Sequence, residues 1–437
     1  MPLKKVRNDK PFATVALLLA GSLLLASCMN ASPSSSAPPK EERALIRFVA
    51  AEYSTETKPL LEKLVKEFGR RNPLIDVELQ VANWDILDGV YTSMISKNQP
   101  PDLLNTNVYA HYAKDGLLNN MTDIMSPELA SKLYPNLVEM DQMDGIQYAI
   151  PYVATTRNLY YNKELFQKAG IAAPPSTWSE LARAAQKIKA LGVAEGVGVD
   201  LTDNETHASL SYVFYGSGGG WMKDGKWQIN SPGNVEGVSF LKELFDKGLT
   251  DPEPTVTTRD EKQRIMGGGQ LAMMISGNYF STVVPKEYPS LQWGKGPMPV
   301  KDGQPPISFG VHDVLVSFKT DHTNQEALSK FLDFLYDDRE YEEMIKREGF
   351  LPATMTVGTR LSEQDEEMKK DLEALRQAKF YPVREPSWQA VLDYARKMGD
   401  AILYEHMSPK EALDELQHFA ESKQSQINAA KKQTEAE

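Results

Sequence analysis

The chain has 437 residues, a net charge of −12, 41% hydrophobic residues and 25% charged residues. This composition is typical of a globular protein and excludes a mostly disordered or collagen-like chain, while the length predicts two or three domains. The acidic balance argues against duplex nucleic acid as a partner, because that ligand needs a basic surface. The single cysteine excludes an intrachain disulfide.

The N-terminus, residues 1–27, is typical of a secretory signal. Four basic residues precede an apolar run at 11–26, after which come Ser27 and Cys28. The ending Leu-Ala-Ser-Cys resembles a bacterial lipobox, which implies cleavage before Cys28, acylation of its thiol and anchoring to the membrane. An uncleaved membrane helix is one alternative, although the run is shorter than the roughly 20 residues that span a bilayer. An ordinary signal peptide is another.

A Ser- and Pro-rich segment follows the cysteine and predicts a flexible tether, so that 28–43 comprises the lipidated residue and its linker. No later apolar run approaches the length of a membrane span. We therefore expect a water-soluble folded part held beside the membrane.

Strand and helix patterns alternate along the rest of the chain. Short apolar strands are predicted at 44–50, 77–81, 101–104, 157–162, 197–199, 271–275 and 314–318. Helices with one apolar face are predicted at 56–71, 86–94, 177–191, 234–247, 323–347 and over much of the chain from 363 onward, with a frayed tail at 429–437. Thr177 with Glu180, and Ser408 with Glu411, have the spacing of capping boxes. The alternation favours an α/β fold with a parallel sheet.

Motifs for catalysis and cofactor binding are absent from the sequence. It contains no HExxH or cysteine pair for zinc, no Walker A loop and no GxSxG elbow. The glycine run at 216–220 lacks the acidic partner and the strand–helix context of a dinucleotide site. We expect no metal, no cofactor and no enzymatic activity, although the many carboxylates leave a glycosidase pair open.

Five groups of segments appear in order between 44 and about 425. They are QYAIPY at 147–152 with LYYNKELF at 159–166, AGI at 169–171 with PSTWSEL at 175–181, GQLAMMISGNY at 269–279, GFLPA at 349–353, and PSW at 386–388 with SPKEAL at 408–413. Together they resemble the extracellular solute-binding proteins of ABC importers, in the sugar-binding family that includes maltose-binding protein.

The resemblance implies a two-lobed periplasmic-binding-protein-like fold of type II, in which the lobes close on a ligand by a hinge. The chain would cross between the lobes near 152–156, 308–310 and 349–352. Lobe 1 would then comprise 44–153 and 310–350, and lobe 2 would comprise 154–309 and 351–428.

Candidate ligand residues of the first lobe follow its strands, because ligands of doubly wound sheets sit outside the carboxyl ends of the strands. A sugar needs aromatic platforms for its C–H faces and polar groups for its hydroxyls. The candidates are Glu52, Tyr53, Trp84, Asn105, Asn107 and Tyr109, with Tyr152 at the first crossing. Polar loops without any ligand are the alternative interpretation.

Three further aromatics are predicted to stack on sugar rings because they match the family's positions. Trp221 follows the glycine run, Tyr279 replaces the family's Trp beside Asn278, and Trp388 lies in a C-terminal helix. Core packing is the alternative for each, and it is the assignment for Trp178 and Trp293. His312 and Asp313, at the returning crossing, either contact the ligand or form a solvated turn.

The sequence thus predicts a monomeric, lipid-anchored, extracytoplasmic receptor on a bacterial cell membrane. It would capture a carbohydrate, in particular an oligosaccharide, and deliver it to the permease subunits of an ABC importer. A receptor of the same fold for a polyamine, peptide or phosphate ester is the first alternative, and an anchored glycoside hydrolase is the second. Clustered arginines in the cleft would favour a phosphate ester, and dominant carboxylates would favour a polyamine.

Overall fold

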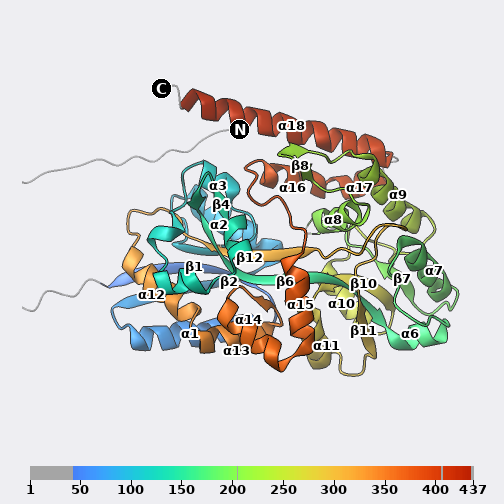
Figure 1. Ribbon diagram of the computed structural model, residues 1–437, viewed down its shortest axis with the longest axis horizontal. Helices are drawn as coiled ribbons and strands as arrows, with labels where there is room; N and C mark the ends of the chain where they lie inside the picture. The colour runs from blue at the N-terminus through green and yellow to red at the C-terminus, as the bar shows by residue number, and fades with distance from the viewer. Residues whose placement is uncertain (1–42, 204, 405–406, 435–437) are drawn as a thin grey trace, which may run out of the picture. The chain divides into compact units, whose positions relative to one another are not determined.

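A mixed β-sheet flanked by helices forms the centre of the computed structural model, which describes residues 43–203, 205–404 and 407–434 (Figure 1). The predicted signal peptide and the predicted lipidation of Cys28 lie outside the described residues, as does nearly all of the predicted tether. Within the described ranges, no helix combines the length and the apolar character needed to cross a membrane.

The secondary structure follows the predicted alternation closely. The strands are β1 (Ala44–Glu52), β2 (Ile75–Asn83), β3 (Leu103–Thr106), β4 (Gln142–Met143), β5 (Ile146–Gln147), β6 (Ala149–Asn162), β7 (Glu195–Gly198), β8 (Met222–Lys223), β9 (Lys226–Trp227), β10 (Leu271–Gly277), β11 (Trp293–Gly296), β12 (Gly310–Val316) and β13 (Leu351–Pro352). The α-helices are α1 (Thr57–Arg71), α2 (Trp84–Ser96), α3 (Ala110–Lys114), α4 (Pro127–Lys132), α5 (Pro135–Met140), α6 (Lys163–Lys168), α7 (Trp178–Lys189), α8 (Thr206–Gly216), α9 (Pro232–Asp246), α10 (Arg259–Gly267), α11 (Phe280–Glu287), α12 (Gln325–Leu335), α13 (Asp338–Glu348), α14 (Met355–Gln364), α15 (Glu366–Arg376), α16 (Trp388–Arg396), α17 (Met398–Leu403) and α18 (Pro409–Thr434). A short 3₁₀ helix, η1, spans Met121–Asp123.

The sheet order is β2-β1-β3-β12-β6-β10-β7, and β11 and β13 also pair with β6. Strand β1 is parallel to β2 and β3, and β10 is parallel to β7, as the βα alternation predicts. Strands β6 and β12, however, pair antiparallel with their neighbours. The sheet is therefore mixed: the prediction of a parallel sheet is confirmed for the β1–β2, β1–β3 and β10–β7 pairs and is wrong for β6 and β12, which run against the strands beside them.

Strand β6 belongs to both halves of the sheet. The first half holds β1, β2, β3 and β12, and the second half holds β7, β10 and β11. Its first part, Ala149–Thr156, pairs with β12, and its second part, Arg157–Tyr161, pairs with β10. The Arg157 backbone N–H donates to the Phe309 carbonyl at 2.8 Å, just before β12 begins. Strand β13 pairs with the first part of β6. The three segments in which we predicted crossings thus lie beside one another.

Each half of the sheet packs its own apolar core. Phe48, Phe68 and Phe331 belong to the core around β1, α1 and α12. Trp221 and Trp388 belong to the core around α7, α8, α9, α16 and α18. Helix α14 packs Val357 and Leu361 into the first of these cores, although the family resemblance implies that 351–428 belongs to the second lobe.

Side-chain caps account for the start of several helices. Thr177 and Glu180 form the predicted capping box of α7, and Ser408 and Glu411 exchange the predicted bonds at the start of α18. The single helix predicted at 323–347 is instead two helices, α12 and α13. The Asp337 side chain accepts from the Arg339 N–H and so starts the second helix.

Candidate functional site

A cleft with a cavity volume of about 90 Å³ lies beside the middle of β6 and is lined from both halves of the sheet. Strand β1 ends at Glu52, Tyr53 follows it, Trp84 begins α2 after β2, and Asn107 follows β3. Because β1 is parallel to β2 and β3, their carboxyl ends meet at one edge of the sheet and bring these side chains together.

Four aromatic side chains form a row along the cleft, in the order Trp84, Tyr53, Phe350 and Tyr279. Successive ring centroids are 6.0, 4.7 and 5.4 Å apart. Trp84, Tyr53 and Tyr279 are half-buried, so part of each ring remains accessible to a ligand. Such a row is suited to stacking against flat, apolar ligand faces.

Charged groups of the second half of the sheet also line the cleft. Arg259 forms an ion pair with Glu205, and its guanidinium lies 5.8 Å from the centroid of the Tyr279 ring. Arg396 pairs with Asp88 across the cleft at 3.8 Å and with Asp393 on its own helix at 3.3 Å. The cleft thus offers hydrogen-bonding groups of both signs beside the aromatic row.

Burial fixes the protonation of several of these groups. It raises the pKa of Asp313 to about 6, although Tyr53 and His312 offset part of this rise. Burial lowers the pKa of His207 to about 3, so its imidazole is neutral at pH 7. Burial also acts to raise the pKa of Glu205, but Arg259 and Arg157, with smaller contributions from other cations, together outweigh burial and hold that pKa below its usual value. Glu205 is therefore ionised and acts as a hydrogen-bond acceptor.

The sequence matches the family model described as bacterial extracellular solute-binding protein over residues 51–342. A binding protein of Brucella abortus (strain 2308) is 31% identical over 394 residues, which cover 88% of this chain and 92% of the relative. The chain belongs to the bacterial extracellular solute-binding protein family.

A further relative of this solute-binding protein and a solved structure of similar fold differ in their ligands. The sn-glycerol-3-phosphate-binding periplasmic protein UgpB of Escherichia coli (strain K12) is 28% identical over 226 residues, which cover 49% of this chain and 50% of UgpB. The solute-binding protein of an ABC transporter from Thermotoga lettingae TMO, solved with α-D-tagatose, superposes with a TM-score of 0.78 at 22% identity and covers 87% of this chain and all of its own. The fold is the two-lobed α/β fold of these proteins.

The solute-binding protein brings some of the predicted ligand residues to the cleft and buries the others. Those that line the cleft are Glu52, Tyr53, Trp84, Asn107, Tyr279 and Asp313. Those that are buried elsewhere are Asn105, Tyr109, Tyr152, Trp221, Asn278, His312 and Trp388. Contact of the first group with a ligand stays a prediction.

Trp221 and Trp388 lie in the core instead of forming platforms in the cleft, and each is 1% exposed. Their ring centroids are 5.0 Å apart, and the Trp221 indole N–H donates to Ser211 Oγ at 2.7 Å. Trp388 also stacks on Tyr381 at 5.7 Å, and Tyr381 lines the cleft. Trp388 therefore packs against Tyr381, a residue of the cleft lining, and does not line the cleft itself.

His312 and Tyr109 meet Asp141 below the cleft. His312 Nε2 is 2.9 Å from Asp141 Oδ1, and the Tyr109 hydroxyl donates to the same oxygen at 3.2 Å. Burial disfavours the imidazolium, but Asp141 outweighs it and raises the pKa of His312. His312 is thus neither a solvated turn residue nor part of the cleft lining, whereas its neighbour Asp313 lines the cleft.

The remaining buried candidates, Asn105, Tyr152 and Asn278, form contacts within the protein. Asn105 accepts a hydrogen bond from the Tyr53 hydroxyl at 3.0 Å and so orients a ring of the aromatic row. The Tyr152 hydroxyl lies 2.8 Å from Met344 Sδ in the first core. The Asn278 side chain accepts from Thr155 Oγ1 at 2.5 Å and donates to the Gly349 carbonyl at 3.0 Å. Asn278 therefore ties together two of the segments where we predicted crossings.

Sequence reasoning missed the charged part of the cleft. The missed lining residues with titratable or aromatic side chains are Asp88, Arg157, Glu205, His207, Arg259, Asp260, Phe350, Tyr381 and Arg396. Two of them carried a usable signal: Arg157 is a charged residue at the start of the apolar strand pattern RNLYYN, and Phe350 lies in the segment GFLPA at a predicted crossing. The others come from α2, α8, α10, α16 and loops, whose approach to the cleft depends on tertiary packing.

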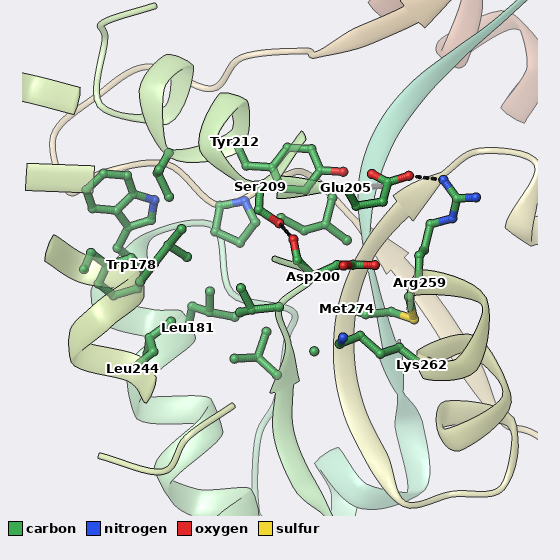
Figure 2. Close-up of a pocket in the computed structure, with 18 residues that line it drawn as sticks. Trp178, Leu181, Asp200, Glu205, Ser209, Tyr212, Leu244, Arg259, Lys262 and Met274 are labelled. Atoms are coloured by element: carbon green, nitrogen blue, oxygen red, sulfur yellow. Dashed lines mark hydrogen bonds and ion pairs between the residues drawn. The ribbon is translucent and has the colours of Figure 1, made fainter. Parts of the chain in front are cut away.

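A second cavity of about 50 Å³ adjoins the cleft, and Glu205 and Arg259 line both (Figure 2). Its polar end holds Asp200 and Lys262, and its apolar end holds Trp178, Leu181 and Leu244 (Figure 2). Burial, with a contribution from Glu205, raises the pKa of Asp200 to about 6. Trp178 stacks on Phe240 at 4.9 Å, in keeping with its predicted packing role.

Nowhere in the described part of the chain do three or more His, Cys, Asp or Glu side chains converge in a way that could hold a metal ion.

Proposed function

We propose that this protein captures a carbohydrate in the cleft and delivers it to the permease subunits of an ABC importer. The observation that carries the proposal is the aromatic row of Trp84, Tyr53, Phe350 and Tyr279, which shares the cleft with hydrogen-bonding groups. A sugar ring presents apolar C–H faces and a rim of hydroxyls, so it needs aromatic and polar surfaces together. The sugar named for the Thermotoga relative supports this choice of ligand class.

The expected role is binding without chemistry. Glu205, one of the buried carboxylates of the cleft lining, is engaged by Arg259, which favours a role as hydrogen-bond acceptor over that of a free catalytic base. Incubation with the sugar that binds best should return that sugar unchanged. Release of shorter products would instead support the hydrolase alternative.

A phosphate ester is the second candidate ligand, because Arg157, Arg259 and Arg396 all line the cleft and UgpB is a relative. Arginine is well suited to phosphate, since its planar guanidinium donates two parallel hydrogen bonds.

Membrane anchoring through Cys28 is the proposed means of keeping the receptor at the permease. The lipobox resemblance supports it, and we expect a Cys28→Ala variant to lose acylation and either to stay uncleaved or to leave the membrane fraction. Mass spectrometry of the wild-type protein that shows residues 1–27 intact and Cys28 unmodified would contradict this.

A thermal-shift screen against mono- and oligosaccharides, polyamines, peptides and phosphate esters tests the ligand class. A ligand that binds only the folded state raises the melting temperature in proportion to the logarithm of its concentration. We expect a carbohydrate to give the largest shift. The largest shift from a polyamine or a peptide would overturn the proposal.

A further inference from the structure

Arg157 is a buried cation without an ionic partner. It is 7% exposed and lines the cleft, yet it forms no ion pair with any residue that the structure describes. Its Nε and Nη1 atoms also have no hydrogen-bond partner among those residues. A buried charge that is left unpaired destabilises the folded state, so folding alone does not account for an arginine at this position.

Two other polar groups of the cleft lack partners in the same way. The His207 Nδ1 atom and the Tyr381 hydroxyl are buried and make no hydrogen bond with any described residue. Their rings lie 5.0 Å apart, and both residues line the cleft with Arg157. A neutral imidazole can donate from one ring nitrogen, and a tyrosine hydroxyl can donate as well.

The carboxylates near Arg157 do not balance its positive charge. Glu205 is near enough to interact with Arg157, but it is already paired with Arg259. Arg396 has its own partners in Asp88 and Asp393. Asp313 is the remaining buried carboxylate of the lining, and it forms no ion pair with Arg157 among the described residues.

The backbone fixes Arg157 where the pairing of β6 changes from β12 to β10. Its N–H donates to the Phe309 carbonyl at 2.8 Å, and its residue pairs with Gly277 of β10. The side chain therefore starts from a rigid strand at the junction of the two halves of the sheet. A rigid starting point is what a binding group needs if it is to meet a ligand in one geometry.

We infer that the carbohydrate is acidic and that Arg157 binds its oxyanion, a carboxylate or a phosphate, with Tyr381 and His207 as additional donors. This inference rests on the proposed function and specifies its ligand. The oxyanion supplies the counter-charge that Arg157 lacks, and the aromatic row takes the sugar ring. A neutral sugar would accept hydrogen bonds from these donors but would leave the positive charge of Arg157 uncompensated.

The first test needs no ligand. Loss of an uncompensated buried charge should leave the melting temperature of the unliganded Arg157→Gln variant unchanged or higher than that of the wild type. Arg183→Gln, at an exposed position in α7, controls for the change in net charge. A clear fall in melting temperature for Arg157→Gln alone would assign Arg157 a structural role and overturn the inference.

The second test measures calorimetric affinity for glucose, glucuronate, glucose 1-phosphate and inorganic phosphate at up to millimolar concentrations. We expect glucuronate or glucose 1-phosphate to bind the wild type at least about 30-fold more tightly than Arg157→Gln, as is typical when one partner of a buried charge pair is removed. The affinity of Arg157→Lys should lie between those of the wild type and Arg157→Gln, because lysine keeps the positive charge but lacks the planar guanidinium. The two acidic sugars distinguish carboxylate from phosphate.

The outcomes separate this inference from the proposed function. Binding of glucose alone, equally by the wild type and Arg157→Gln, overturns the inference and leaves a neutral-sugar receptor. Arg157-dependent binding of inorganic phosphate without any sugar keeps the oxyanion site and overturns the carbohydrate function. Failure of every anionic probe to bind overturns the inference.

Discussion

Trp84 and Trp388 were both predicted to contact the ligand, and the structure separates them. Trp84 is half-buried at the cleft, and Trp388 is 1% exposed in the core. Trp84→Ala should weaken sugar binding roughly 5- to 150-fold, the range for the loss of one stacking ring, with little change in melting temperature. Trp388→Ala should lower the free energy of unfolding by about 3–5 kcal/mol. Calorimetry and thermal denaturation of both variants check this, and the reverse pattern would contradict it.

Asp313 should make stability depend on pH. Its pKa is about 6 in the folded protein and 3.8 in the unfolded chain, so between these values the folded state holds a proton that the unfolded chain has released. The free energy of unfolding therefore falls as pH rises through this window, and the full cost applies above pH 6.

An Asp313→Asn variant removes that cost. It should exceed the wild type in free energy of unfolding by about 1–3 kcal/mol at pH 7, and the difference should shrink towards zero near pH 4. Urea denaturation across this pH range measures it. A difference that does not vary with pH would show that the carboxyl group is not the cause.

Single residues were predictable where one physical rule placed them. Tyr53 and Trp84 follow parallel strands, and the rule that ligands sit beyond strand ends located both at the cleft. Trp388 was placed by its match to a family motif, which could not tell whether the ring reaches the ligand or supports Tyr381 from behind. Arg157 was missed because its meaning depends on the partners it lacks, and only three-dimensional packing reveals that.

At the scale of elements, the C-terminal end of α13 depends on Gly349. Its φ is +76°, and a Cβ there would lie 2.3 Å from Thr282 Oγ1. Gly349→Ala should therefore lower the free energy of unfolding by roughly 2–4 kcal/mol, through left-handed strain together with overpacking. The matched control is Gly116→Ala, where φ is +73° with no atom within 4 Å, and it should cost about 1 kcal/mol. Equal losses in chemical denaturation would refute the packing argument.

Elements were predicted well where the pattern was local and poorly where it was not. Helix α7 begins at its predicted capping box, whereas the helix expected at 323–347 breaks at Asp337, a residue that caps a new helix. The direction of β6 and β12 could not be deduced from periodicity, because an apolar strand pattern does not record which way its neighbours run.

For the whole molecule, the account predicts that ligand binding closes the two lobes. Strands β6 and β12 and the segment at Gly349 lie side by side where the halves meet, which is the arrangement expected of a hinge. Small-angle scattering should show a smaller radius of gyration with saturating ligand than without it. An unchanged radius in the presence of bound ligand would show that the lobes do not move.

The most direct test of the central claim is a crystal structure of the protein grown with the sugar that gives the largest thermal shift. We predict density for one sugar ring against Trp84, Tyr53 and Tyr279, with polar contacts to Arg157 and Glu205. A sugar bound elsewhere on the molecule, with this cleft empty, would contradict the account.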